Sequence, residues 1–200
     1  MQKATNWWHF ASIWLMKKKG WDYSFKNGLT PWREGANVDE VLRIPRISGG
    51  NALDLGCGTG EWAIALAKKG FEVEGLDFSS EALRIAQSLP NAQKVTWAKW
   101  DLEKLAQYPF KHALYDIVID HKVLSFIQEK ENYLEAVKFI LSGVYILTVF
   151  HEHDKKGAIV ILKDEFNRLI LPRFKVLDST VTKPRPGKVL ATYYLTSLSR

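Results

Sequence analysis

The sequence has few of the features that mark secreted, metal-binding or membrane-spanning chains. Its 200 residues include a single cysteine, Cys57, which forms no internal disulfide and no thiolate cluster for zinc or iron–sulfur. It has no apolar run of about 18 residues, the length that a membrane-spanning helix needs. The N-terminus does not read as a signal peptide, because the lysines at 17–19 follow its apolar stretch instead of preceding it. We therefore expect a protein of a reducing, cytoplasmic compartment that neither spans a membrane nor holds a metal.

The composition is that of an ordinary folded domain, but the charge is unevenly spread. Apolar residues make up 46% and charged residues 25%, which argues against a mostly disordered chain. Of the net charge of +6, residues 1–36 contribute six Lys/Arg against two acids, and residues 172–200 contribute six against one. Basic ends can mark an anionic partner, although solvated basic termini are the commoner case.

Residues 1–36 read as an extension that precedes a single domain at 37–200. The extension holds five of the eight tryptophans. Residues 7–16 are predicted to be helical, and Gly20, Asn27–Gly28 and Pro31 are predicted to break the chain into turns. A membrane-surface helix would need a single apolar face, and an RNA-stacking platform would need exposed rings. We favour a lid that is buried over a ligand site.

From residue 51 onwards strands and helices alternate. The predicted strands are 52–55, 72–76, 95–97, 115–120, 144–150, 174–181 and 188–198. The predicted helices are 61–69, 80–88, 133–141 and 164–171, with a short helix between Asn37 and Pro45. This alternation predicts an α/β fold with a doubly wound, largely parallel sheet. The last two strands form a hairpin through 184–187, so they are antiparallel to each other.

A glycine-rich loop between the first strand and the first long helix carries the chemistry. Asp54–Gly60 reads DLGCGTG, in which glycines let the backbone turn sharply and approach a ligand. The helix N-terminus that follows offers free N–H groups. Asp77 ends the second strand, where an acid is placed to accept both hydroxyls of a ribose. The loop therefore predicts a nucleoside site, in which Cys57 is a packed residue and not a nucleophile.

Two nucleoside cofactors compete for this site. The run Gly58–Ala63 fits the G-x-G-x-x-A pattern, so spacing alone leaves NAD open. Glu61, at the start of the helix, would repel a pyrophosphate, whereas Asp54 suits a cofactor with a cationic ammonium group. The charges favour S-adenosylmethionine over NAD.

The sequence resembles the class I S-adenosylmethionine-dependent methyltransferases over nearly its whole length. The segments that carry the resemblance are LDLGCGTG, GLDFS, WDL and YDIVIDHKVLSFI. It implies a Rossmann-like sheet of order 3-2-1-4-5-7-6 with the seventh strand antiparallel, and S-adenosylhomocysteine as the product. It implies that the first motif lines the methionine end, that Asp77 holds the ribose and that Asp101 contacts the adenine. The full set of cofactor-binding residues that it implies is Asp54, Gly56, Cys57, Gly58, Gly60, Asp77, Phe78, Ser79, Asp101, Leu102 and Asp120.

Residues 30–35, TPWREG, resemble the entry segment of the thiopurine and tellurite-resistance methyltransferases. In those small-molecule enzymes the N-terminal segment covers the cofactor, which implies that Trp32 packs near the methionine end. The family's LKPGG loop is missing, and residues 141–143 stand in its place. That loop lies on the face away from the site.

The candidate catalytic residues follow the fourth and fifth predicted strands. Asp120 and His121 lie where the fourth strand meets the cleft, and either substrate contact or structural capping would explain them. His151, Glu152 and His153 follow the fifth strand, but two histidines at spacing i, i+2 have no further ligand elsewhere, so we reject a metal site. A surface loop is the commoner explanation of such a run, and the alternative that we keep is contact with the substrate. A base is needed only if the nucleophile arrives protonated, and then His121, His151 or Glu152 would serve.

These features leave three functions open. The first is methyl transfer to the sulfur, nitrogen or oxygen of a small molecule by in-line displacement. The second is an RNA or protein methyltransferase that uses the basic ends, and the third is a cofactor-binding protein without catalysis. If the final hairpin points to the ligand edge, Lys183, Arg185 and Lys188 form a positive rim with the N-terminal lysines. Such a rim favours an anionic acceptor.

Overall fold

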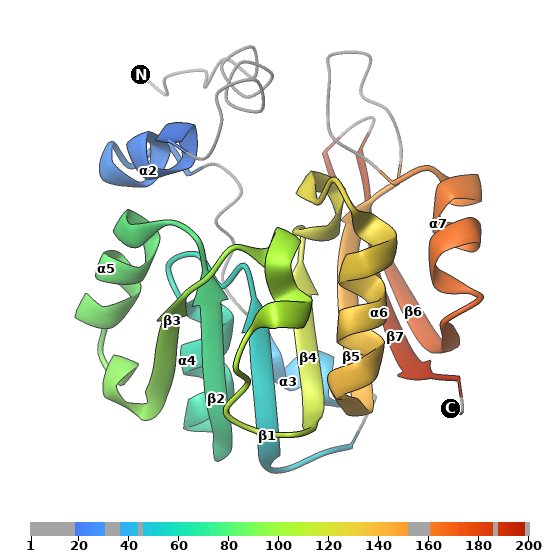
Figure 1. Cartoon of the computed structure of the whole chain (residues 1–200), viewed down its shortest axis with the longest axis horizontal. Helices are drawn as coiled ribbons and strands as arrows, with labels where there is room; N and C mark the ends of the chain where they lie inside the picture. Colours follow the sequence, from blue (N-terminus) through green and yellow to red (C-terminus); the bar gives the residue numbers. More distant parts are fainter. Residues whose placement is uncertain (1–18, 31–36, 44–45, 152–160, 186–187, 199–200) are drawn as a thin grey trace.

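The computed structural model of the chain describes residues 19–30, 37–43, 46–151, 161–185 and 188–198 (Figure 1). The predicted helix at 7–16 and the candidate residues Trp32, Glu152 and His153 lie outside these ranges. Expectations about them therefore stay predictions.

Seven strands form one sheet whose order confirms the expected topology. The strands are β1 (Gly50–Leu55), β2 (Phe71–Asp77), β3 (Val95–Lys99), β4 (Tyr115–His121), β5 (Leu141–Phe150), β6 (Phe174–Arg185) and β7 (Lys188–Ser197). They lie in the order β3-β2-β1-β4-β5-β7-β6. β1 to β5 pair in parallel, and β7 is antiparallel to both β5 and β6.

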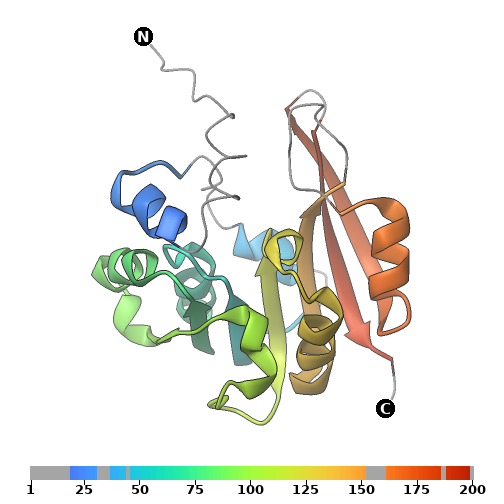
Figure 2. The ribbon, with the colours of Figure 1, turned by 45° about the horizontal axis from the view of Figure 1, so that its top comes forward.

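Helices cover both faces of this sheet (Figures 1 and 2). They are α2 (Lys19–Lys26), α3 (Val38–Arg43), α4 (Glu61–Lys68), α5 (Ser80–Ser88), α6 (Lys130–Ile140) and α7 (Lys163–Ile170), with three short 3-10 helices η1 (Ala92–Lys94), η2 (Leu102–Gln107) and η3 (Leu124–Phe126). One core cluster lies between the sheet and α3 and α4, and the other between the sheet and η2, α6 and α7. The central strands are continuous apolar runs because both of their faces are buried.

The predicted chain break at Gly20 is wrong, because Gly20 lies within α2. Glycine inside a helix costs about 1 kcal/mol relative to alanine. Phe25 of α2 is buried and lies against the glycine loop, and α2 packs beside α5, so tertiary contacts outweigh that cost. The helix ends at Asn27–Gly28 as predicted, where Gly28 takes the left-handed conformation with φ 65°.

The final hairpin points to the edge of the sheet at which ligands bind. β6 pairs antiparallel with β7, which pairs antiparallel with β5, so β6 runs parallel to β5. The backbone of Lys183, Arg185 and Lys188 therefore lies at the carboxyl edge, as expected. Within the part of the chain that the structure describes, no helix has the length and hydropathy needed to cross a membrane.

Candidate active site

The glycine loop presents bare backbone at the start of α4. Gly56, Gly58 and Gly60 all have left-handed φ angles of 65°, 53° and 82°. A Cβ placed on Gly58 would meet no described atom closer than the Phe25 ring at 3.8 Å, whereas one on Gly56 would lie 2.4 Å from a Val123 methyl carbon. At Gly56 the loop is therefore packed tightly against the chain that leaves β4. At Gly58 it is not crowded, and the nearest described side chain there is Phe25.

Asp54, the last residue but one of β1, has a buried carboxyl. Its Oδ2 accepts a hydrogen bond of 3.0 Å from the Ala63 N–H in the first turn of α4. Burial raises the pKa of Asp54 to about 8, and the nearby acids Asp77 and Glu61 also raise it. A ligand with a positive charge would favour the ionised form, so the position suits an ammonium group.

Asp77 ends β2 and holds two backbone N–H groups of the loops around it. Its Oδ2 accepts from Gly58 at 2.9 Å and its Oδ1 accepts from Ser79 at 2.8 Å. Burial raises its pKa to about 6, although both hydrogen bonds lower it. An ionised carboxylate has about four acceptor positions, so Asp77 keeps acceptor capacity beyond these two bonds. A ribose has two hydroxyls to donate.

Taken together, this donor set fits S-adenosylmethionine. Asp77 offers acceptors for two hydroxyls, and Asp54 offers a carboxylate to an ammonium. The loop between them carries no side chain at Gly58 that would block a nucleoside. Glu61, whose carboxylate accepts from the Thr59 hydroxyl at 2.7 and 2.8 Å, adds a further negative charge at the start of α4. A dinucleotide would bring its pyrophosphate against that charge.

Helix α2 spans the mouth of this site and is anchored on both sides. Asp22 Oδ1 accepts from the Ser79 hydroxyl at 2.6 Å and from the Glu81 N–H at 3.2 Å, so it caps α5 together with Ser79. On the other side the Trp21 ring meets Phe126 of η3 edge-on, at 5.1 Å between centroids. Figure 1 shows α2 beyond the carboxyl ends of the strands, over α5.

The residues expected around the adenine lie where β3 ends. The Trp100 N–H donates to the Asp77 carbonyl at 3.0 Å, which ties this segment to the end of β2. Asp101 caps η2 by accepting from the Glu103 N–H at 3.3 Å, and Leu102 is buried in the core. Phe78 is half-buried beside Asp77. Their contact with adenine stays a prediction.

Cys57 is a buried thiol within the loop, and its N–H donates to the Leu76 carbonyl. Burial raises the pKa of this thiol, as do the Asp54 and Asp77 charges. It is therefore protonated at neutral pH and packs as a small apolar group, as expected.

Asp120 is turned away from α4 and into the core beneath η3. Its Oδ1 accepts from the N–H groups of Val123 and Leu124, and its Oδ2 accepts from the hydroxyls of Tyr133 and Tyr145 at 2.9 and 3.1 Å. Burial raises its pKa to about 6, against the lowering by these donors. With four donors, Asp120 holds the chain that leaves β4 in place.

His121 points to the opposite face of the sheet from Asp120. Its ring lies 5.3 Å from the Trp62 ring, and its Nε2 is buried with no hydrogen-bond partner among the described residues. Burial, together with the neighbouring Lys122 charge, lowers its pKa to about 3. The imidazole is therefore neutral at pH 7 and is a weak proton acceptor.

His151 follows β5 and is held on both ring nitrogens. Nδ1 lies 2.7 Å from the Ile161 carbonyl and Nε2 lies 2.6 Å from the Tyr193 hydroxyl. A carbonyl only accepts, so Nδ1 carries a proton; in the neutral ring Nε2 then accepts from Tyr193. Within the described ranges, no group of three potential metal ligands is present.

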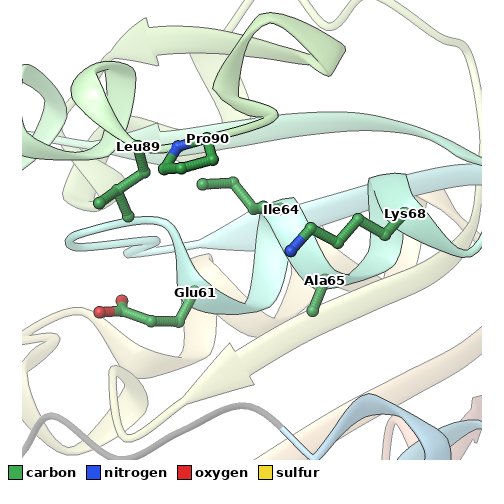
Figure 3. A pocket seen from close by; sticks show the side chains of 6 residues that line it. All are labelled: Glu61, Ile64, Ala65, Lys68, Leu89 and Pro90. Carbon is green, nitrogen blue, oxygen red and sulfur yellow. The ribbon is translucent and has the colours of Figure 1, made fainter.

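A shallow groove of about 310 Å³ runs along the outer side of α4 (Figure 3). The side chains that line it are Glu61, Ile64, Ala65, Lys68, Leu89 and Pro90. Only Glu61 of these adjoins the glycine loop. The groove therefore follows the helix and is separate from the nucleoside site between β1 and β2.

Four residues with contacts near the carboxyl edge belong to no sequence motif and were not predicted. They are Asp22, Phe25, Lys122 and Tyr193. The spacing of Trp21 and Phe25 is that of one helix face and would have revealed α2. Lys122 and Tyr193 give no local signal, because their neighbours come from strands far away in the sequence.

Comparison with known families identifies the central part of the chain. Residues 52–142 match the family model described as a methyltransferase domain. The ajmaline N-methyltransferase of Rauvolfia serpentina is 31% identical over 118 residues, which is 58% of this chain and 39% of that protein. Thiocyanate methyltransferase 1 of Brassica oleracea is 32% identical over 120 residues, 56% of this chain and 51% of that protein. This chain spans less than half the length of the first curated relatives that it matches.

Solved structures share the fold over more of the chain. A TehB-like S-adenosylmethionine-dependent methyltransferase from Corynebacterium glutamicum has a TM-score of 0.64 at 17% identity, and covers 88% of this chain and 99% of its own. The magnesium protoporphyrin IX methyltransferase of Synechocystis, solved with bound S-adenosylmethionine, has a TM-score of 0.65 at 20% identity, and covers 88% and 94%. At these identities the likeness shows the fold, and kinship with the tellurite-resistance branch stays a prediction.

Proposed function

Because this chain belongs to the class I S-adenosylmethionine-dependent methyltransferases, we propose that it transfers a methyl group from S-adenosylmethionine to a small-molecule nucleophile. The observation that carries the proposal is the pair of acids on either side of the glycine loop. Asp54 and Asp77 both keep acceptor capacity beyond their backbone hydrogen bonds. Bound S-adenosylmethionine supplies a methyl carbon on a positively charged sulfur, which a nucleophile attacks in line.

Each part of the site has a proposed role in holding the cofactor. Asp77 accepts the ribose hydroxyls, and Asp54 faces the ammonium of the methionine end. The backbone of the three loop glycines lines the methionine end, beside Cys57. The remaining proposed contacts, around the adenine and the cover of the site, are Phe78, Ser79, Asp101, Leu102 and Trp32.

The chain's contribution to the reaction is alignment and the exclusion of water. Helix α2 contributes to both, because Trp21 and Phe25 lie over the loop and against η3. The role of Asp120 is to hold the chain after β4 in place, because its four hydrogen-bond donors leave its carboxylate little capacity to accept from a ligand. His121 is too weakly basic to remove a proton at neutral pH. If the acceptor arrives protonated, His151 would have to receive the proton through the Tyr193 hydroxyl, which donates to its Nε2.

Small molecules are the proposed acceptors, in a cytoplasmic setting. The matched relatives include proteins named for ajmaline and for thiocyanate, a small alkaloid and a small anion. The net charge of +6 supports a second candidate, a polymeric acceptor such as RNA. A steep fall of activity with rising salt on an RNA substrate, and none on small acceptors, would favour that second candidate.

The deciding experiment is a calorimetric titration of the full chain with S-adenosylmethionine, with NAD as the control ligand. We expect micromolar binding of S-adenosylmethionine and none of NAD. A screen of thiols, amines, phenols and carboxylic acids for release of S-adenosylhomocysteine then tests catalysis. Tight cofactor binding without product from any acceptor pool would identify a non-catalytic binding protein. Binding of NAD alone would overturn the roles of Asp54 and Glu61.

A further inference from the structure

One residue, Ser79, is hydrogen-bonded to two acids from different parts of the chain. Its N–H donates to Asp77 Oδ1 at 2.8 Å, and its hydroxyl donates to Asp22 Oδ1 at 2.6 Å. Asp77 is the proposed ribose acceptor, whereas Asp22 belongs to α2, which precedes the domain. Ser79 is fully buried, so both of its donors are shielded from water, which strengthens their hydrogen bonds. The position of α2 is therefore connected to Asp77 through a single residue.

The same face of α2 also contacts the second donor to Asp77. The Gly58 N–H donates to Asp77 Oδ2 at 2.9 Å. The Phe25 ring lies 3.8 Å from the position that a Cβ would take on Gly58. Asp22 and Phe25 are three residues apart in a helix and so point to the same side. Both residues that hold Asp77 by their N–H groups are thus contacted by α2.

Asp77 is shielded in this arrangement, although it keeps acceptor capacity. The residue is only 6% exposed. To donate to its oxygens, the ribose hydroxyls must come within about 3 Å of them. Figure 1 shows α2 beyond the carboxyl ends of the strands and over α5, in the direction from which a ligand approaches this edge of the sheet. A cofactor therefore reaches Asp77 when α2 moves aside.

Helix α2 is short and is followed by an exposed turn. It has eight residues, and isolated helices below about 12–15 residues are marginal in water, so α2 depends on its contacts with the domain. Residues 26–29 after it are exposed. Gly28 takes the left-handed conformation, and no described atom lies within 4 Å of the position that its Cβ would take. The helix can thus leave its place without disturbing the packing around this turn.

We propose that Asp22 is a positioning residue that holds α2 over the cofactor site, and that its release sets the rate at which S-adenosylmethionine enters and S-adenosylhomocysteine leaves. We call the two hydrogen bonds that Asp22 Oδ1 accepts, from the Ser79 hydroxyl and the Glu81 N–H, the α2 latch. This inference rests on the proposed function and names the residue through which α2 acts on the site. Asp22 acts through Ser79 and needs no contact with the cofactor.

The α2 latch should affect the rates of cofactor exchange and not the affinity. It consists only of groups of the chain, so it forms with or without cofactor. Its loss destabilises the closed position of α2 equally in both states, and the rate constants of association and dissociation rise together. Two hydrogen bonds to a half-exposed carboxylate account for about a tenfold change in each rate constant.

The test combines stopped-flow tryptophan fluorescence of S-adenosylhomocysteine binding with hydrogen exchange of the backbone amides at 19–30, both on the full chain. Asp22→Ala removes the latch, whereas Asp22→Asn keeps an oxygen acceptor and removes only the charge. The matched control is Asp39→Ala, an exposed acid of α3 that pairs with Lys69.

We expect Asp22→Ala to raise both rate constants about tenfold, with Kd unchanged within about twofold. Without cofactor, its amides at 19–30 should exchange about tenfold faster, because α2 opens more often. Asp22→Asn should restore the rates and the amide protection of the unmodified chain, and Asp39→Ala should match it in both. A purely electrostatic role of Asp22 would not be restored by asparagine.

The outcomes separate this inference from the proposed function. Unchanged amide exchange in Asp22→Ala overturns the α2 latch, whether or not the chain binds S-adenosylmethionine. Weaker cofactor affinity at an unchanged association rate also overturns the inference, because Asp22 would then support bound cofactor and not control its passage. Equal acceleration in Asp22→Ala and Asp22→Asn assigns the effect to charge and overturns it as well. Amide exchange that depends on Asp22 in a chain that binds neither S-adenosylmethionine nor S-adenosylhomocysteine refutes the proposed function and leaves the latch standing.

Discussion

The two halves of the carboxyl edge differ in charge and in the way that their charged groups are held. Around β1 and β2, Asp54 and Asp77 are anchored by backbone N–H groups and keep acceptor positions for a ligand. Around β4 and β5 the edge has a buried lysine, a neutral imidazole and two aromatic rings. The acid of that half, Asp120, is fully engaged on the opposite face. An acid at a strand end is therefore not always available to a ligand. Its availability depends on how many hydrogen-bond donors of the protein already occupy its oxygens.

The largest expected effect comes from removing the ribose acceptor. Asp77→Ala should weaken S-adenosylmethionine binding by about 100-fold, because two hydrogen bonds to a charged group are lost. Titration calorimetry measures this, and Asp77→Asn, which keeps one carbonyl oxygen, should lose less. Asp116→Ala, an acid at the amino end of β4, is the matched control and should bind as the unmodified chain does. An unchanged affinity in Asp77→Ala would remove the ribose assignment and with it the role of the acidic half.

A second effect distinguishes the halves by pH. The pKa of Asp54 is about 8, so its proton must leave before it pairs with an ammonium. Affinity for S-adenosylmethionine should therefore rise by about tenfold between pH 6 and pH 7.5, where the ammonium of the cofactor is still largely protonated, and this rise should be lost in Asp54→Asn.

The same carboxyl sets the opposite trend in the stability of the ligand-free chain. Its pKa is raised above the unfolded value of 3.8, so the folded state binds the proton more tightly. Stability from this group is complete below about pH 4 and is lost as pH rises through 8. Asp54→Asn should therefore melt at a higher temperature than the unmodified chain at pH 8.5, by about 2–4 °C or more. A lower melting temperature would argue against an uncharged Asp54 in the ligand-free chain.

A smaller effect concerns Asp120, the acid of the β4 and β5 half that is turned into the core. Tyr133→Phe removes one of four donors from Asp120 and should cost about 1–2 kcal/mol in the free energy of unfolding. Tyr108→Phe removes one donor from Glu74, the other buried acid held by two tyrosines, and is the matched comparison. Denaturant titration measures both. A large loss of cofactor affinity in Tyr133→Phe alone would return Asp120 to the ligand site.

The smallest effect tests the helix that spans both halves. Trp21→Ala removes the contact with Phe126 and should speed release of S-adenosylmethionine by about threefold, because an aromatic pair contributes about 0.5–1.5 kcal/mol. Tyr23→Ala, on the exposed side of α2, is the control. Stopped-flow tryptophan fluorescence gives the rates. Equal rates in all three proteins would mean that α2 does not cover the cofactor.

Local patterns were sufficient to predict the framework of the fold. Ser80–Ser88 forms the predicted helix with Ser79 as its cap, because capping and periodicity are both local. Asp54 and Asp77 fall at or next to strand ends as expected: Gly56 directly follows β1, and Asp77 is the last residue of β2. The expected break at Gly20 failed because contacts of α2 with the distant α5 overcame a local propensity.

The sequence predicted those parts of the site that depend on residues close together in the chain. Asp120 lies at the expected strand end. The hydroxyls of Tyr133 and Tyr145 donate to it across the core, and no sequence spacing predicts these contacts. His121 reads as a base from its residue type, whereas burial against Trp62 makes it a weak one. Lys122 takes a left-handed conformation that its sequence does not favour. The burial of charged and polar groups around the ends of β4 and β5 depends on packing between distant segments, which the sequence does not show.

Trp97 of β3 packs behind the glycine loop. A Cβ on Gly60 would lie 2.5 Å from its indole and one on Gly75 would lie 3.0 Å away, while the Ala86 methyl carbon fills the adjoining space. Native cores tolerate such substitutions only when volume is conserved. In evolutionary terms these four positions, 60, 75, 86 and 97, change together or not at all. Among relatives, a larger residue at 75 should accompany a smaller one at 97, and the shape of the cofactor loop thus depends on a side chain of a different strand.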